Sequence, residues 1–148
     1  MTRKMKKFLG MALSVVSIAS LTIPSVYAGQ ENDIAYKFRI GSFHSNGQCG
    51  TDQSRQTGDP ADTWKVKLST SGEGKGTYTT FWLENYDGDN VSKTVDVKQG
   101  KGYYYRPSYR SGCKTHVWLT AENNNFNSNS YEVSGCWDEE TGVFKNKN

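Results

Sequence analysis

Apolar and polar residues alternate with a period of two along several stretches of this chain of 148 residues. In residues 34–40 and 64–68 every second side chain is large and apolar, and lysine or arginine stands between several of them. Successive side chains of a β-strand point to opposite faces, so such a stretch has one apolar face and one polar face. No part of the chain after residue 28 carries apolar residues at helical spacing over three turns. The pattern predicts an all-β protein.

The alternation predicts six strands, at residues 34–40, 64–68, 77–84, 91–98, 114–121 and 131–137. Each is expected to bury one side only, which is typical of two antiparallel sheets stacked on their apolar faces in a β-sandwich. The polar stretch 42–62 is expected to be a long connection. Turn residues recur every eight to twelve residues, which favours an immunoglobulin-like order of strands, with a jelly roll or a small barrel as the alternatives.

The N-terminus has the pattern of a secretory signal peptide. Residues 1–7 carry four basic residues and no acidic one, and residues 8–23 form an apolar run too short to span a bilayer comfortably. Val26 and Ala28 place compact side chains at the positions that a signal peptidase reads. We therefore expect cleavage after Ala28, a secreted, extracellular product without a membrane span, and a single domain over residues 29–148.

Removal of the signal peptide changes the charge of the chain. The formal net charge of +3 becomes −1 when the four basic residues at positions 3, 4, 6 and 7 leave. The remaining acidic and basic residues are interspersed, without a cluster of lysine and arginine. This distribution favours neither a nucleic acid nor a charged membrane surface as the partner.

Several segments carry a resemblance to known proteins. Residues 33–38, 72–76, 80–83, 121–125 and 133–141 resemble a family of small secreted proteins of Gram-positive bacteria that is defined only as a domain of unknown function. More distantly, a signal peptide followed by one small domain rich in glycine, tyrosine and tryptophan is similar to the lactococcin-type β-sandwich bacteriocins. The first resemblance implies no mechanism, and the second implies an antibacterial activity.

Three cysteines lie in the exported part, where disulfides form and persist: Cys49, Cys113 and Cys136. In an immunoglobulin-like order all three would lie at one end of the sandwich. If strands 114–121 and 131–137 pair with their apolar residues on one face, Cys113 and Cys136 point to opposite faces. This register favours a Cys49–Cys113 disulfide. The third thiol would be either a small buried apolar group or a free thiol for intermolecular bridging or nucleophilic attack.

Few residues suggest catalysis. His44 precedes Cys49 by five residues and His116 follows Cys113 by three, so a small cysteine-dependent enzyme is one hypothesis. Both histidines are expected at the surface, however, and the common motifs of hydrolases, metalloproteases and phosphate-binding loops do not occur. The acidic run 138–140 is expected to be a solvated end. We predict no catalytic residue and no cofactor.

One segment has the spacing of a calcium-binding loop. Asn85, Asp87 and Asp89 stand at positions one, three and five of such a loop, and Asp96 stands at position twelve. Asn90 occupies the position where the bend requires glycine, and the segment also fits a turn between two strands. We therefore predict a turn and no metal.

An aromatic face is the main candidate for a binding site. If strands 77–84 and 114–121 are neighbours, Tyr78, Trp82, His116 and Trp118 share one outer face of the sandwich. Exposed indoles stack on sugar rings or anchor a protein partner. The alternative is that one tryptophan is covered by a loop, such as 42–62. The sequence thus predicts a secreted, non-enzymatic protein that binds a cell-wall glycan or an envelope protein, with a bacteriocin-like protein and a cysteine-dependent enzyme as alternatives.

Overall fold

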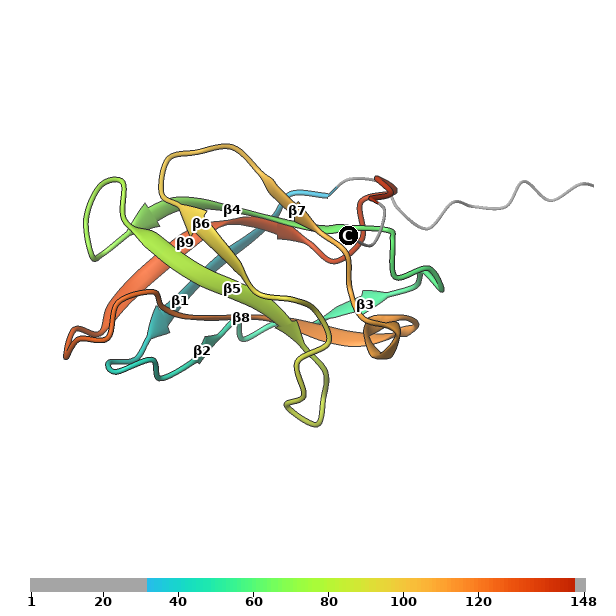
Figure 1. Ribbon diagram of the computed structural model, residues 1–148, viewed down its shortest axis with the longest axis horizontal. Helices are drawn as coiled ribbons and strands as arrows, with labels where there is room; N and C mark the ends of the chain where they lie inside the picture. Colours follow the sequence, from blue (N-terminus) through green and yellow to red (C-terminus); the bar gives the residue numbers. More distant parts are fainter. Residues whose placement is uncertain (1–31, 146–148) are drawn as a thin grey trace, which may run out of the picture.

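The computed structural model describes residues 32–145, which form two antiparallel sheets packed face to face (Figure 1). The signal peptide predicted at residues 1–28 lies outside the described residues. The first sheet contains, in order, β1 (Ile34–Ile40), β9 (Tyr131–Asp138), β4 (Trp64–Ser71) and β7 (Tyr104–Arg106). The second contains β2 (Gly47–Gln48), β8 (Thr115–Asn123), β5 (Tyr78–Glu84) and β6 (Val95–Lys98), and β3 (Gln53–Arg55) also pairs with β8. The predicted antiparallel β-sandwich is confirmed.

The strands pair in a nested pattern. The first strand, β1, pairs with the last, β9; β2 and β3 pair with β8; β4 pairs with β7; and β5 pairs with β6. This is the pairing of one long hairpin that has been rolled up, and the additional pairs β4–β9 and β5–β8 close the roll into two sheets. Such a strand order defines a jelly roll. The jelly roll, named above as an alternative, therefore replaces the immunoglobulin-like order.

The rolled topology also corrects the expected pairing of the last two strands. β8 and β9 lie in different sheets, so they do not share the predicted register. Alternation along each strand shows only which face is apolar, and two consecutive amphipathic strands fit equally well side by side or on opposite sheets. The connection between them, residues 124–130, crosses from one sheet to the other.

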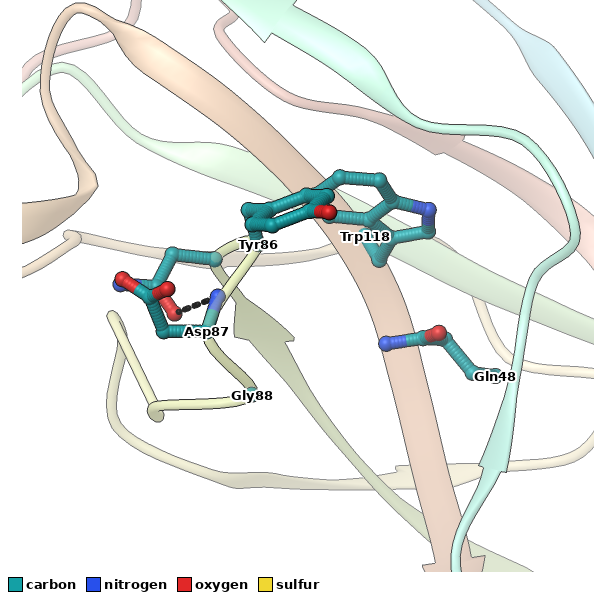
Figure 2. Close-up of a pocket in the computed structure, with 6 residues that line it drawn as sticks. Gln48, Tyr86, Asp87, Gly88 and Trp118 are labelled. Carbon is teal, nitrogen blue, oxygen red and sulfur yellow. Dashed lines mark hydrogen bonds between the residues drawn. The ribbon is translucent and has the colours of Figure 1, made fainter.

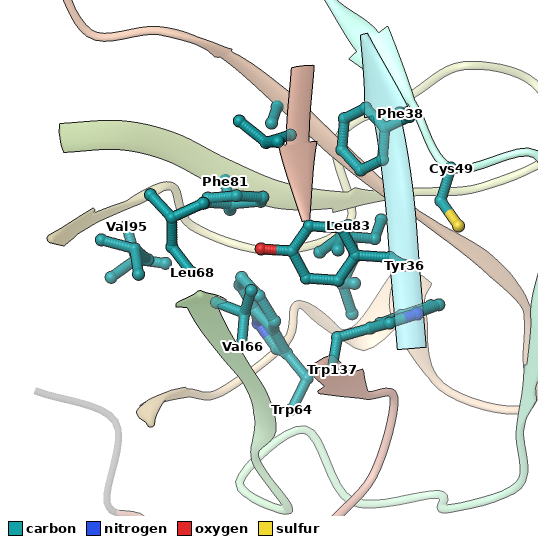
Figure 3. Close-up of a cluster of buried hydrophobic side chains, with 14 of the residues drawn as sticks. Tyr36, Phe38, Cys49, Trp64, Val66, Leu68, Phe81, Leu83, Val95 and Trp137 are labelled. Atoms are coloured by element: carbon teal, nitrogen blue, oxygen red, sulfur yellow. The ribbon is translucent and has the colours of Figure 1, made fainter. Parts of the chain in front are cut away.

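The core lies between the two sheets (Figure 3). Trp64 and Trp137 of the first sheet are fully buried, as are Phe81 and Leu83 of the second. The ring of Tyr36 packs edge-on against Phe81, with 5.8 Å between ring centroids, and so joins the two sheets. These are the apolar positions of the alternating pattern, so the sequence identified the core correctly.

Three short strands and one longer strand differ from the prediction. β2, β3 and β7 fall in segments predicted to be connections, and residues 91–94 are not the first half of a strand, since only Ser92 among them forms an isolated bridge, with Ser108. Short strands with polar side chains do not show the alternation on which the prediction depends. The single helical segment of the described chain is a 3-10 turn at Arg110–Gly112, and no described helix has the length and apolarity needed to cross a membrane.

The residues after β9 fold back against the sandwich. Thr141 N donates to Thr63 O (2.9 Å), and Thr63 N donates to Val143 O (2.9 Å). The guanidinium of Arg55, which is fully buried, donates hydrogen bonds to the carbonyl oxygens of Glu139 and Asp62. The prediction that residues 138–140 form a solvated end is therefore wrong, since all three are buried in this segment.

Candidate ligand-binding face

The four residues predicted to bind a ligand all lie on adjacent strands of the second sheet. β5 pairs with β8, which meets the condition on which the predicted face depended, with Trp82 opposite Thr120 and Glu84 opposite Trp118. Tyr78 and Trp82 of β5, like His116 and Trp118 of β8, alternate with side chains buried in the core. They therefore lie on the outer face of this sheet.

These residues do not form one cluster, however. Tyr78 and His116 stand at opposite ends of the β5–β8 pair. The register places Tyr78 beyond the level of Asn123, so it lies about eight residues, or roughly 27 Å, from His116 along the strand direction. Tyr78 lies under the ammonium group of Lys98 (5.5 Å to the ring centroid), and the Nδ1 atom of His116 is 2.5 Å from Asp52 Oδ2. Only the two tryptophans lie near the middle of the face.

The two tryptophans differ in exposure. Trp118 is half-buried, whereas Trp82 is only 4% exposed, which corrects the expectation of an exposed indole pair. Trp82 Nε1 donates to Glu84 Oε1 (2.8 Å), so its polar atom is satisfied within the protein. This agrees with the alternative in which one tryptophan is covered. A sequence pattern fixes the face of a strand but not whether a neighbouring segment covers that face.

A depression of about 370 Å³ surrounds the exposed side of Trp118 (Figure 2). Its lining comes from two strands and from the turn after β5: Gln48, Asn85, Tyr86, Asp87, Gly88 and Trp118. Tyr86 is 86% exposed, and its ring lies 6.3 Å from that of Trp118 at an angle of 52°. Sequence reasoning missed Tyr86 because it lies in a turn, outside the alternating pattern.

Hydrogen bonds hold the polar groups beside this depression in place. The side-chain nitrogen of Gln48 donates to Glu84 Oε2 (3.0 Å) and to Thr120 Oγ1 (3.4 Å). Glu84 is buried and accepts from Trp82 through its other oxygen. The carboxylate thus fixes the orientation of both the Gln48 amide and the Trp82 indole. The floor of the face is preorganised before any ligand arrives.

The turn that carries Tyr86 is built by Asn85. Asn85 Oδ1 accepts hydrogen bonds from the backbone N–H groups of Asp87 (3.1 Å) and Asp89 (2.9 Å), which confirms the predicted turn. Gly88 adopts φ of 80°, a conformation that glycine reaches without strain. Across residues 32–145 no group of three or more His, Cys, Asp and Glu side chains is arranged to hold a metal ion.

The predicted Cys49–Cys113 disulfide is not present, and all three cysteines are free. Cys49 is buried in the core between the sheets. Cys113 follows the 3-10 turn, where its Sγ lies 3.8 Å from Tyr109 O, and Cys136 lies on β9 of the first sheet. The expected convergence depended on an immunoglobulin-like order, and in the jelly roll the three residues occupy separate regions.

The histidines pair with carboxylates rather than with thiols. His44 Nδ1 lies 3.3 Å from Glu122 Oε2, and His116 contacts Asp52 as described. Cys49 is only 7% exposed. The described contacts therefore give no support to the cysteine–histidine pairs considered from the sequence.

A second exposed aromatic cluster joins two loops at one end of the sandwich. Phe43 and Phe126 lie 5.3 Å apart, and the ring of His44 stacks on Phe126 at 5.5 Å. Phe43 and His44 both have positive φ, at 54° and 59°, which is uncommon for residues other than glycine. Phe43 N donates to Asn127 O (2.8 Å) and ties the two loops together. No sequence pattern predicts this cluster, because its residues lie in loops.

Comparison with protein families identifies the chain. A family described as "Protein of unknown function (DUF2712)" matches residues 24–141. The chain belongs to this family. The DUF2712 match covers every strand of the jelly roll, so the family corresponds to the whole sandwich, and the expectation of an uncharacterised family is confirmed. No curated protein matches the chain, and no solved structure matches it.

Proposed function

We propose that this protein binds a glycan of the bacterial cell envelope, without catalysing a reaction, through the depression beside Trp118. The observation that carries the proposal is the combination of two adjacent aromatic rings, Trp118 and Tyr86, with fixed polar groups. One face of a sugar ring is apolar, and its hydroxyl groups are polar. A sugar is therefore complementary to a surface that offers both kinds of contact.

The aromatic rings would provide the apolar contacts. Tyr86 and Trp118 lie at 52° to each other, so they form a bent shelf rather than a stack. Aromatic side chains bury a large area at a small entropic cost and have a polar atom at their edge. Since Tyr86 is 86% exposed, a sugar that stacks on it would remove a large apolar area from water.

The polar lining would satisfy the hydroxyl groups of the sugar. Gln48, Asn85 and Asp87 offer amide and carboxylate groups around the shelf. The Gln48 amide is held by Glu84, so little entropy is lost when it orients a ligand. Binding sites of this kind combine an aromatic wall with a few convergent polar groups, which determine specificity.

The cellular location in this proposal comes from the sequence. The predicted signal peptide would direct the protein out of the cell, and the resemblance to small secreted proteins of Gram-positive bacteria suggests that the outer wall is the nearest surface. A bacteriocin-like activity stays an alternative prediction. Killing of a sensitive strain by the purified protein would favour it, whereas adsorption to the wall without loss of viability would favour binding alone.

The test is adsorption of the purified protein to insoluble peptidoglycan from which proteins and anionic polymers have been removed. We expect wild-type protein to bind, and the double variant Tyr86→Ala, Trp118→Ala to bind at least about tenfold more weakly, since two aromatic contacts are lost. Phe126→Ala is the matched control, because Phe126 is 73% exposed but lies in the other aromatic cluster. Thermal unfolding should verify that all three proteins are folded.

Two outcomes would overturn the proposal. One is that folded wild-type protein does not adsorb, in which case an envelope protein becomes the better candidate partner. The other is that the double variant adsorbs as well as the wild type, which would place the site elsewhere. Release of soluble sugar fragments during the incubation would contradict the non-enzymatic part of the proposal.

A further inference from the structure

A second depression, of about 230 Å³, lies on the same outer face as the first. Its lining residues come from both margins of the sheet and from its centre: Asn46, Trp82, Asn90, Thr94 and Glu122. Trp82, which is nearly buried, contributes to it from the centre of the sheet. Neither the aromatic shelf nor the polar groups around it account for this depression.

The two depressions follow one strand. Trp118 lines the first depression and Glu122 lines the second, and both project from the same face of β8. Four residues of a strand span roughly 13 Å, which is longer than one sugar ring. Thr120 lies between them, opposite both Gln48 and Trp82. The Gln48, Glu84 and Trp82 hydrogen bonds therefore connect the two depressions through one rigid strip of the sheet.

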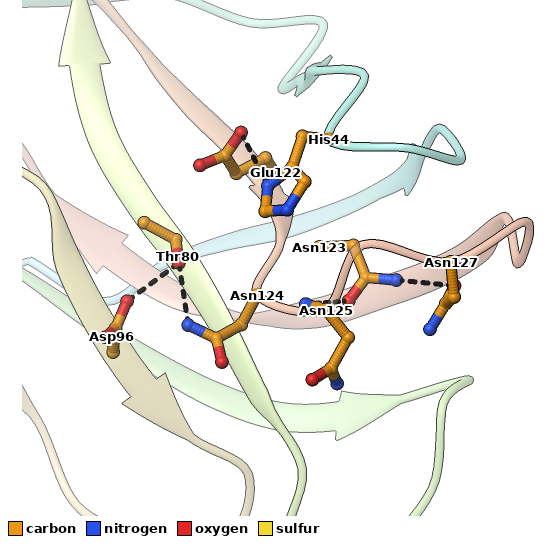
Figure 4. A network of polar contacts seen from close by, with 8 residues as sticks. All are labelled: His44, Thr80, Asp96, Glu122, Asn123, Asn124, Asn125 and Asn127. Atoms are coloured by element: carbon orange, nitrogen blue, oxygen red, sulfur yellow. Dashed lines mark hydrogen bonds and ion pairs between the residues drawn. The ribbon is translucent and has the colours of Figure 1, made fainter.

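Glu122 of the second depression belongs to a neighbourhood of oriented polar groups (Figure 4). Glu122 is paired with His44, which fixes the position of its carboxylate at 3.3 Å. Thr80, which stands opposite Glu122 on β5 and does not itself line the depression, donates to Asp96 Oδ1 (2.7 Å) and accepts from Asn124 (3.4 Å). Asn46 and Thr94 are exposed on opposite sides of Trp82. These side chains offer donors and acceptors without a large apolar surface.

The charge of the lining restricts the ligand. Asp87 lines the first depression, Glu122 lines the second, and Glu84 lies between them, while no lysine or arginine is among the described residues that line either depression. A polyanionic chain, such as a polymer of phosphodiesters, would be repelled by these carboxylates. An uncharged sugar chain would instead donate hydroxyl hydrogen bonds to them.

We propose that the two depressions are subsites of one groove along β8, and that the groove takes an uncharged oligosaccharide long enough to occupy both. This inference rests on the proposed function, and it adds the length and the charge class of the ligand. Trp118 and Tyr86 hold one end of the chain by stacking, and Asn46, Thr94 and Glu122 hold the other end by hydrogen bonds.

The experiment measures affinity against ligand length. The probes are the monomer, trimer and pentamer of N-acetylglucosamine, titrated calorimetrically into the purified protein. We expect affinity to rise at least about tenfold from the monomer to the pentamer. The double variant Asn46→Ala, Thr94→Val should lose most of that gain while it binds the monomer within about twofold of the wild type. Asn129→Ala, an exposed asparagine that lines neither depression, is the control.

The outcomes separate this inference from the proposed function. If the monomer and the pentamer bind equally, or if the Asn46→Ala, Thr94→Val variant loses monomer and pentamer affinity alike, the two depressions are not subsites of one groove. The aromatic site would still stand if Tyr86→Ala, Trp118→Ala abolishes binding. Tighter binding of a soluble wall polymer of phosphodiesters than of the pentamer, with a steep loss of affinity in salt, would overturn the inference that the ligand is uncharged. If neither peptidoglycan nor any oligomer binds, both proposals fail together.

Discussion

Glu139 places a carboxyl group inside the protein, at the start of the segment that folds back after β9. Its side chain is 9% exposed, and one carboxylate oxygen has no hydrogen-bond partner. Burial raises the pKa of Glu139 to about 7, and the neighbouring carboxyl groups of Asp138 and Glu140 act in the same direction. The nearby buried cation, Arg55, gives its hydrogen bonds to backbone carbonyl oxygens, including that of Glu139 itself.

The raised pKa makes a prediction about pH and stability. Between the ordinary pKa of 4.5 and about 7 the folded protein holds a proton that the unfolded chain releases, so wild-type stability falls as pH rises through this range. Glu139→Gln stays neutral. We therefore expect the free energy of unfolding of this variant, minus that of the wild type, to rise by up to about 3 kcal/mol between pH 5 and pH 8.

Urea unfolding at several pH values measures this difference. Glu132→Gln is the control, because Glu132 is an exposed glutamate of β9 whose carboxylate pairs with Lys37. A stability difference between Glu139→Gln and wild type that does not change with pH would mean that folding does not raise the pKa of Glu139.

At the scale of the strands, β9 is held between β1 and β4, and Gly135 is a position of β9 that leaves no room for a side chain. Gly135 lies opposite Tyr36 on one side and Leu68 on the other. A Cβ atom at this position would overlap the carbonyl group of Lys67 and would approach the Tyr36 hydroxyl to 2.9 Å. The Tyr36 hydroxyl donates to that same carbonyl (3.1 Å). A side chain at residue 135 therefore disturbs both the strand pairing and the core.

We expect Gly135→Ala to lower the free energy of unfolding by about 1 to 3 kcal/mol, as is typical of a group forced into a filled space. Gly102→Ala is the matched control, since a Cβ there meets no atom within 4 Å, and its effect should stay within about 0.5 kcal/mol. Equal stabilities of the two variants in chemical denaturation would show that β4 and β9 are not so closely apposed.

At the scale of the whole molecule, the jelly roll separates the three cysteines. Cys49 is in the core, whereas Cys113 and Cys136 are half-buried in different parts of the fold. In denaturant without a reductant, alkylation should therefore modify three cysteines per chain. In the native protein Cys113 and Cys136 should react first, and Cys49 should react only as fast as the core opens.

Intact-mass measurement over time follows both reactions. The labelling rates are compared between one series in buffer at constant pH and a second series in mild urea. Urea should accelerate the labelling of Cys49 in particular, because it favours opening of the core. A chain with only one modifiable cysteine in full denaturant would show that a disulfide forms after all.

The sequence by itself determined where the longer amphipathic strands lie, which of their faces are apolar and which of their residues form the core. The period-two pattern is a local property of each strand, and a strand shifted by one residue would expose its whole apolar set. The pattern therefore identifies core residues, and it correctly predicts that Trp64, Phe81, Leu119 and Trp137 are buried. The same local property placed Trp82 and Trp118 on the outer face of one sheet. The pairing of β5 with β8, on which the proposed aromatic face depended, is not encoded in this local pattern.

Tertiary structure alone decided how the strands are ordered and what lies over each face. Each amphipathic strand can join either sheet, so the nested pairing of β1 with β9 and of β2 with β8 depends on long-range packing that no local pattern encodes. That order separates the cysteines, buries Trp82, and brings Tyr86 from a turn and Gln48 from a two-residue strand to the side of Trp118. The candidate site therefore combines two tryptophans on strands that the sequence predicted with residues from segments in which it predicted only connections.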